Sequence, residues 1–434
     1  MLFLFALCLL VYLGNLRTVP LARGGDTIPN RLIPFAILAH GAPTLDPFRS
    51  DFRNAGVRTW YLNERRGALV SFYPIGTALA ALPVYVPVYA FLALSGHSSP
   101  GIMFALSEQT EKLAAASLTG LAVVLFYATI RRRSSSRVAL GASLVFAFAS
   151  SMWATASQML WQQTAVAFAL ALGLWLLTSP RLPRWACAAA GLALSLAMTA
   201  RPTAALLFAA GLFAALLTAG DARLRVQRAL AFLLGGVPLI ALNLAINMYY
   251  FGNLAGGYGL IAGMHSSGLF ARDRLLGIAG LLISPNRGLL VFTPIALLGI
   301  IGLARQVGTG KPRDPVLASF GLASFVHLLV VGTYPVWWGG WSFGPRYLVD
   351  IIPVLALAGV GTWNRLGAPA RRLAMIGILW SVLVQVNGVL CYPASQWDGR
   401  MSEDPARAAW SLKHPQLLED FMSWAVRDRW STPF

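Results

Sequence analysis

Residues 131–184 read RRRSSSRVALGASLVFAFASSMWATASQMLWQQTAVAFALALGLWLLTSPRLPR. Two apolar runs, 138–156 and 160–178, lie between two arginine-rich loops. Each run approaches the roughly 20 residues that a helix needs to cross the hydrocarbon core of a bilayer. Because short basic loops stay on the cytoplasmic side of a membrane, this stretch predicts one helix that crosses outward and one that returns.

The same pattern recurs along the chain. Basic loops occur at 131–137, 181–184, 223–228, 305–313 and 365–372, and the further pairs of apolar runs are 185–200 with 202–219, 229–251 with 288–304, and 315–332 with 347–363. Single apolar runs occupy 1–14, 112–130 and 373–391. Of the 434 residues, 57% are hydrophobic and 12% charged, against roughly 25% charged in a soluble domain. Residues 1–391 are therefore predicted to form an all-α transmembrane bundle of about 11 to 13 helices.

Two segments do not fit the simple pattern of paired crossings. The apolar run 74–95 contains Pro74, Pro83 and Pro87, and proline interrupts helices. We expect a re-entrant or interfacial pair of short helices there; the alternative is that one basic loop lies on the opposite side. The tail, 392–434, mixes tryptophans with charges and predicts a pair of short amphipathic helices on the outer membrane surface.

Composition excludes several classes of site. In a membrane protein a net charge of +18 first reflects basic cytoplasmic loops and attraction to anionic lipid. Because the sequence contains no recognised nucleic-acid motif, we expect no nucleic-acid partner. The three cysteines lie at unrelated spacings, which excludes a disulfide framework. The five histidines form no HxxxH or HxH pair, so neither a metal nor another cofactor is inferred. The alternative that the sequence leaves open is a divalent ion held by Asp26 and another loop acid, because oxygen ligands can come from scattered positions.

The first external loop, about 15–70, is rich in arginine despite its predicted side. It contains eight arginines, Arg23 among them, and four acids that include Asp46. Guanidinium groups bind phosphate in a bidentate manner, so this loop suits the phosphate or diphosphate of a lipid carrier. Attraction to anionic lipid headgroups is the alternative explanation.

Asp26 follows two glycines about a dozen residues after the first apolar run. The glycines allow a sharp turn and would hold the carboxylate near the bilayer edge. A general base must come within hydrogen-bond reach of the acceptor hydroxyl, and an acceptor meets a lipid-borne donor only at this interface. The alternative role, compatible with the first, is to cap a helix expected from Thr27 to Leu38 with Pro29 in its first turn.

Four further stretches carry a resemblance to a known family. They are Tyr73-Pro74-Ile75-Gly76, Ser157 to Gln162, Ser284 to Leu290 with Thr293-Pro294, and Trp337 to Tyr347. Together with the Gly-Asp pair they resemble bacterial members of the GT-C superfamily, related to protein O-mannosyltransferases and aminoarabinose transferases.

The resemblance implies a GT-C-like fold and a catalytic or metal-neighbouring role for Asp26. It also places Tyr73 among the substrate-binding residues. Many relatives have a histidine where this chain has Gln163, which weakens any metal or proton-transfer role at that position.

The stretch Trp337 to Arg346 combines three tryptophans with three glycines. The indoles of Trp338 and Trp341 suit the apolar faces of sugar rings, and Arg346, followed by Tyr347, suits a phosphate oxygen. An aromatic belt at the membrane interface is the alternative explanation. A belt does not require the Gly-Gly and Gly-Pro-Arg sequences, so a site is favoured.

The remaining candidates also lie at predicted outer helix ends. Asn286 and Arg287 occupy a Ser-Pro-Asn-Arg-Gly turn, where Arg287 binds phosphate or snorkels to the interface. Arg201 reaches the same cavity or closes a helix hairpin. The last three, Gln158, Trp161 and Gln162, hydrogen-bond sugar hydroxyls or satisfy backbone groups.

These features predict a glycosyltransferase in the cytoplasmic membrane of a bacterium, with its active site facing the exterior. It would move a sugar from a polyprenyl phosphate or diphosphate to an envelope glycan, lipid or protein. Asp26 would act as base and arginines would bind the leaving phosphate. The rivals are a transporter or flippase for a lipid-linked or anionic solute and a non-catalytic assembly subunit.

Overall fold

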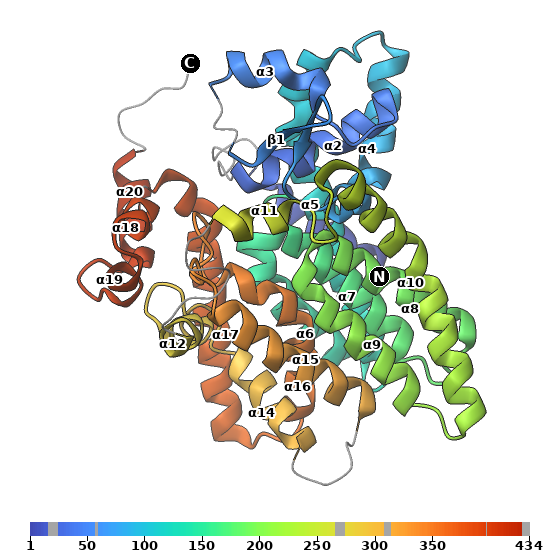
Figure 1. Ribbon diagram of the computed structural model, residues 1–434. Helices are drawn as coiled ribbons and strands as arrows, with labels where there is room; N and C mark the ends of the chain where they lie inside the picture. The colour runs from blue at the N-terminus through green and yellow to red at the C-terminus, as the bar shows by residue number, and fades with distance from the viewer. Residues whose placement is uncertain (16–24, 57–59, 265–273, 308–313, 396, 428–434) are drawn as a thin grey trace.

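The chain folds into a bundle of helices, many of them lying side by side (Figure 1). The computed structural model describes residues 1–15, 25–56, 60–264, 274–307, 314–395 and 397–427. Within them, six helices are long and apolar enough to span a membrane: α4 (Gly76–Leu94), α5 (Pro100–Arg131), α10 (Ala222–Phe251), α15 (Pro315–Gly332), η5 (Arg346–Ile351) with α16 (Ile352–Trp363), and α17 (Ala368–Leu390).

Shorter apolar helices complete the bundle: α1 (Leu2–Leu13), α6 (Ser136–Phe148), α7 (Gln162–Leu177), α8 (Arg184–Ala200), α9 (Ala205–Leu217) and α14 (Ala296–Val307). The described residues thus contain twelve apolar helices, counting η5 with α16 and the short turn η4 (Pro202–Ala204) with α9, which agrees with the expected 11 to 13. The prediction of an all-α, multi-pass bundle is confirmed.

Glycines bring two neighbouring helices, α8 and α10, into direct backbone contact. A Cβ on Gly191 of α8 would lie 1.9 Å from the Phe232 carbonyl oxygen of α10. A Cβ on Gly235 of α10 would lie 1.9 Å from the Ala188 carbonyl oxygen of α8. Small residues allow this approach, and close packing is a main source of helix association in a membrane.

The expected break in the run 74–95 is wrong. Pro83 and Pro87 lie inside α4, one helix of 19 residues. Neighbouring helices can support a proline-containing helix in the bundle, and α4 packs against α2 (Ile28–His40), α5 and α8.

The segment predicted to be the first external loop contains more structure in its described residues than the sequence suggested. The strands β1 (Leu62–Arg65) and β2 (Ala68–Ser71) form an antiparallel hairpin, next to η2 (Asp46–Phe48) and α3 (Arg49–Asn54). Arg66 and Gly67 both have positive φ, 51° and 76°, as a tight two-residue hairpin turn requires. In Figure 1 this region and α2 lie at the upper end of the bundle, and α14 and α16 at the lower end.

The tail also differs from the expectation. Its described residues, 392–395 and 397–427, contain three short α-helices rather than two: α18 (Asp398–Glu403), α19 (Pro405–Trp410) and α20 (Gln416–Arg427), preceded by the turn η6 (Tyr392–Ala394). Trp397 and Ala409 are buried against the bundle. Figure 1 shows the three helices together at one side of the molecule, and they pack on α17 and on the turn after α12 (Arg274–Ile283).

Candidate active site

Asp26 lies in the short turn η1 (Gly25–Thr27), directly before α2. Its Oδ1 accepts a hydrogen bond of 2.9 Å from the Tyr73 hydroxyl, and its Oδ2 lies 3.0 Å from Nη2 of Arg346. The side chain remains 31% exposed. The N-cap of α2 is Thr27, and no side chain caps the helix, so the capping role expected of Asp26 is wrong. The carboxylate instead faces two functional side chains and is accessible.

Tyr73 precedes α4 and is held as a hydrogen-bond donor. Burial raises the pKa of its hydroxyl well above the usual value, and the neighbouring Asp26 charge raises it further. The hydroxyl therefore keeps its proton at neutral pH and can donate it to the carboxylate. This bond holds one carboxylate oxygen of Asp26, and Arg346 contacts the other.

Arg346 begins η5, and its side chain is 7% exposed. Its guanidinium lies over the Trp161 ring, 4.2 Å from the centroid, and 5.5 Å from the Tyr347 centroid. Gly339, with φ of 87°, brings the preceding loop close to the base of this arginine. Nε of Arg346 is buried without a hydrogen-bond partner among the described residues. The guanidinium therefore keeps a donor for a further acceptor.

A second arginine stands beside the first. Nη1 of Arg201, at the end of α8, lies 2.8 Å from the Asp350 carboxylate, and its guanidinium lies 4.7 Å from the Tyr347 centroid. Both partners of this ion pair are buried. Arg201 thus joins the cluster through the Tyr347 ring, and its charge is already matched.

The two candidate glutamines that follow η3 (Met152–Ala156), a π-helical turn, have different hydrogen-bond partners. Gln158 accepts hydrogen bonds from Asn15 and Lys112. Gln162 accepts one of 2.9 Å from the Tyr258 hydroxyl, and its own Nε2 is buried without a partner among the described residues. Tyr258 also packs edge-on against Tyr73, with centroids 6.4 Å apart. Gln162 therefore retains a donor near the cluster.

Sequence reasoning missed a charged group on α5. Glu111 accepts a hydrogen bond from the Leu160 N–H and lies 3.5 Å from Arg31. Lys112, fully buried, contacts Gln158. Ionisable residues within an apolar helix usually mark a function or a necessary structural link, and this signal was present in the sequence. These residues fix the Asp26 turn against the Gln158 turn.

The tryptophan side chains of this region differ in their exposure to solvent. Trp341 is 60% exposed, whereas Trp338 is half-buried and packs edge-on against Trp337. Trp60, 56% exposed, lies 6.2 Å from Tyr73 between ring centroids. Exposed indoles suit sugar rings as well as the membrane interface.

Two candidates of the first loop are not part of this cluster. Asp46 accepts hydrogen bonds from the Leu69 N–H and from Arg49, which closes the hairpin onto α3. Burial acts to raise its pKa, but these hydrogen bonds outweigh burial and the net pKa lies below the usual value. The contacts give Asp46 a structural role. Arg23 lies outside the described residues.

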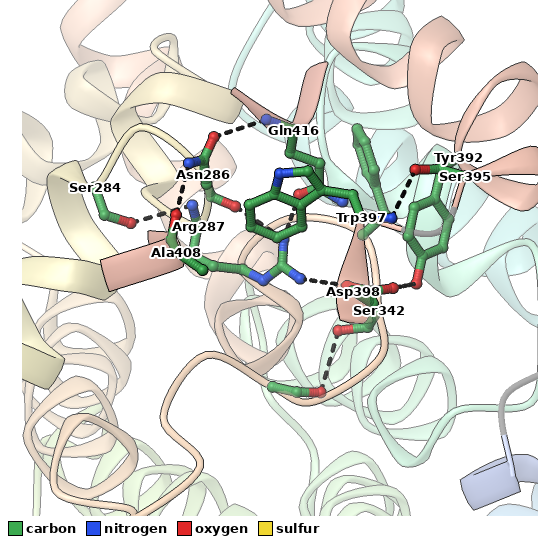
Figure 2. Close-up of polar contacts among 12 residues, drawn as sticks. Ser284, Asn286, Arg287, Ser342, Tyr392, Ser395, Trp397, Asp398, Ala408 and Gln416 are labelled. Carbon is green, nitrogen blue, oxygen red and sulfur yellow. Dashed lines mark hydrogen bonds and ion pairs between the residues drawn. The ribbon is translucent and has the colours of Figure 1, made fainter. Parts of the chain in front are cut away.

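Asn286 and Arg287 hold the tail. Figure 2 shows Arg287 pointing toward Asp398 and Gln416, under the ring of Trp397. The Arg287 side chain is fully buried, and the distance to the Asp398 carboxylate is 2.7 Å. Its snorkelling to the interface is therefore wrong, and its contacts lead to the tail rather than to Asp26.

Asn286 completes the same junction (Figure 2). Its Nδ2 donates to the Ala408 and Ser411 carbonyls, and its Oδ1 accepts from the Gln416 N–H. These bonds satisfy the whole amide with backbone groups of the tail. The Ser-Pro-Asn-Arg-Gly turn therefore acts as an anchor for the tail.

No group of three or more His, Cys, Asp or Glu side chains in the described ranges has the geometry of a metal site. The carboxylate of Asp26 contacts Arg346 and Tyr73. The arrangement combines an accessible carboxylate with a buried cation, which are the elements of a base and an anion clamp.

No protein-family model and no curated protein matches this sequence. Among solved structures, ArnT from Cupriavidus metallidurans bound to undecaprenyl phosphate superposes with a TM-score of 0.52 at 15% identity, over 98% of this chain and 76% of ArnT. The apo form gives 0.51 and 14%, over 98% and 75%. The Archaeoglobus fulgidus oligosaccharyltransferase in complex with Zn and sulfate gives 0.46 and 11%, over 99% and 59%. The chain is therefore a multi-pass membrane protein that shares the fold of ArnT.

Proposed function

We propose that this protein is a glycosyltransferase that moves a sugar from a polyprenyl phosphate or diphosphate to a hydroxyl acceptor. The observation that carries the proposal is the contact of Asp26 with Arg346, next to the hydroxyl of Tyr73. A fold shared with ArnT, a protein seen bound to undecaprenyl phosphate, supports the lipid-linked donor.

Asp26 would act as the general base. Its exposed carboxylate accepts the proton of the acceptor hydroxyl while the acceptor oxygen attacks the anomeric carbon of the sugar. The bond from that carbon to the phosphate oxygen breaks, and the electron pair leaves with the lipid phosphate. Attack from the face opposite the phosphate inverts the anomeric configuration.

Arg346 would link the two ends of this reaction. A guanidinium presents five N–H donors in a rigid fork, of which one contacts Asp26 and Nε has no partner among the described residues. A phosphate oxygen placed at this free edge gains a charge-assisted hydrogen bond as its charge develops. Gln162 would add a further donor through its unpartnered Nε2.

The outer rim would receive the sugar and the acceptor. Trp60, next to Tyr73, and the exposed Trp341 and half-buried Trp338 of the loop before Arg346 would supply the aromatic faces. The basic loops at the other helix ends favour a cytoplasmic location for that side. The site would therefore act at the outer face of a bacterial cytoplasmic membrane, on an envelope glycan, lipid or protein.

The test is sugar transfer by purified protein in liposomes, from radiolabelled polyprenyl-phosphate donors to envelope acceptors. Asp26→Asn is expected to lower the transfer rate about 100-fold or more, because a positioned base contributes about that much. Glu64→Gln, which removes an exposed carboxylate from the same loop, should keep the wild-type rate. Thermal unfolding of each variant reports whether it is folded.

Other outcomes would contradict the proposal. Movement of a lipid-linked solute across the bilayer without any transfer would support the transporter class. Full transfer by a folded Asp26→Asn protein would leave the reaction without its assigned base.

A further inference from the structure

A cavity that is separate from the candidate active site opens among the helix ends that carry the basic loops. It has a volume of about 270 Å³ and is lined by the ends of α5, α14, α15 and α16. Leu317, Leu357 and Ala358 form an apolar part of its wall, and Arg133, Arg305 and Arg365 form a polar part. A cavity with one apolar wall and one basic wall suits an amphiphile with an anionic head.

The charges around this cavity do not cancel. Asp314 is the one acidic residue in its lining, and its carboxylate contacts Arg133 and accepts from the Val316 and Leu317 N–H groups. Arg305 and Arg365 make no ion pair within the described residues. The cavity thus keeps two arginines without an ion pair among the described residues, one on α14 and one in the turn after α16.

A buried hydroxyl adds a second, independent sign of a ligand. Thr362 lines the cavity and is 1% exposed, and its Oγ1 has no hydrogen-bond partner among the described residues. A buried hydroxyl without a partner costs free energy, and a bound acceptor oxygen would remove that cost.

The cavity lies about one membrane thickness from the candidate active site. Glu111 of α5 accepts from the N–H of Leu160, the residue before Trp161, whose ring stacks on Arg346 of the candidate site. Ile130 of the same helix lines the cavity. At about 1.5 Å per residue these positions are about 29 Å apart along the helix axis, close to the roughly 30 Å of the hydrocarbon core. The cavity therefore opens at the opposite leaflet from Asp26.

We propose that this cavity binds the phosphodiester headgroup of an anionic glycerophospholipid from the cytoplasmic leaflet. Arg305 and Arg365 hold the phosphate oxygens, Thr362 donates its hydroxyl, and the glycerol backbone packs on the apolar wall. Basic pockets between transmembrane helices on the cytoplasmic side are suited to such headgroups. This site is separate from the donor site and would tie the lower helix ends of the bundle together.

The test is lipid binding to the purified full chain in detergent, followed by native mass spectrometry and thermal unfolding. Phosphatidylglycerol, phosphatidylcholine with the same acyl chains, and inorganic phosphate at matched ionic strength are titrated separately. Phosphatidylglycerol should bind at least about tenfold more tightly than the other two, because only it combines an anionic head with a glycerol backbone.

Two variants locate the site. Arg305→Gln with Arg365→Gln should weaken phosphatidylglycerol binding about tenfold or more, and Thr362→Val roughly threefold without a change of charge. The control, Arg371→Gln with Arg372→Gln, removes two exposed charges beyond the cavity and should change binding less than about threefold.

Three results would overturn the proposal. Equal weakening by the cavity pair and the control pair would indicate general attraction to the basic surface. Equal binding of inorganic phosphate would indicate a soluble anion as ligand. No preference for phosphatidylglycerol over phosphatidylcholine would exclude recognition of the anionic head. Unfolding temperatures without lipid show whether each variant is folded.

Discussion

At the scale of single residues, the candidate site depends on how Asp26 is held. The carboxylate has a tyrosine hydroxyl on one oxygen and a guanidinium on the other, so its orientation is set from two sides. The same guanidinium is fixed by stacking on Trp161. A base that is oriented in advance loses less freedom on reaching the transition state.

Replacing Tyr73 by phenylalanine should test this orientation. The change removes one hydrogen bond to a charged group, which contributes about 1.5 to 3 kcal/mol, so we expect kcat for sugar transfer to fall about 10- to 100-fold. The KM for the lipid donor should stay near its wild-type value, because Tyr73 contacts the base and not the phosphate clamp.

Tyr89→Phe is the matched control for this variant, since Tyr89 lies in α4 and does not contact Asp26. A Tyr73→Phe protein with unchanged kcat, or with a raised KM alone, would show that the hydroxyl does not orient the base.

At the scale of elements, the site is assembled where helices end. Gly76, at the start of α4, lies so close to α8 that a Cβ would be 2.2 Å from the Ala200 nitrogen. This contact brings Tyr73, just before α4, next to Arg201, just after α8. Helix ends also supply backbone without regular hydrogen bonds, which membrane proteins tolerate where it lines a cavity.

The crossing of α8 and α10 gives a prediction at this scale. Gly235→Ala would place a methyl group 1.9 Å from the Ala188 carbonyl oxygen, so the two helices must move apart. We expect a loss of about 1 to 3 kcal/mol in stability, seen as a lower unfolding temperature in detergent.

The control substitution has the opposite expected sign. Gly141 lies in α6 with nothing within 4 Å of a Cβ, and alanine there should stabilise the helix by up to about 1 kcal/mol. If Gly235→Ala unfolds at the same temperature as Gly141→Ala, the glycines do not determine the crossing.

At the scale of the whole molecule, the tail is a docked unit rather than a free surface helix. Arg287 and Asn286 bind it from the bundle, and α20 packs on α17. Asp420 of α20 is fully buried there, and burial raises its pKa from 3.8 to about 7. Burial also raises the pKa of Asp398.

The docked tail should therefore be less stable at higher pH. The docked state binds a proton that the released state loses above about pH 4, so docking weakens as pH rises from about 4 to about 7, by up to about 4 kcal/mol. Limited proteolysis of residues 397–427 should be faster at pH 8 than at pH 5.5.

Asp420→Asn should remove most of this pH dependence and slow proteolysis at pH 8, because an amide has no carboxylate to ionise. Glu403→Gln, a change at an exposed acid of α18, should behave as wild type. Proteolysis that is independent of pH in the wild-type protein would disprove the assigned role of Asp420.

Local sequence patterns are enough to predict the class of fold and the position of most helices. Apolar runs such as 315–332 coincide with α15, since hydrophobic length is a local property that the bilayer thickness selects. Asp26 and Arg346 could also be selected, because each combines a charged residue type with glycines at the end of an apolar run. The break predicted in α4 is wrong because the helices packed around α4 support its prolines, and local sequence does not show those neighbours.

The pairing of the charged side chains, in contrast, depends on how the helices pack. Arg346 pairs with Asp26 across 320 positions, whereas Arg287, an equal candidate by its local sequence, pairs with the tail. The groups Glu111, Asp350 and Tyr258 entered the site from other helices, and the second cavity formed from four helix ends. Ion pairing and burial depend on distances of a few ångströms. Those distances arise from helix packing, which the period of an apolar run does not encode.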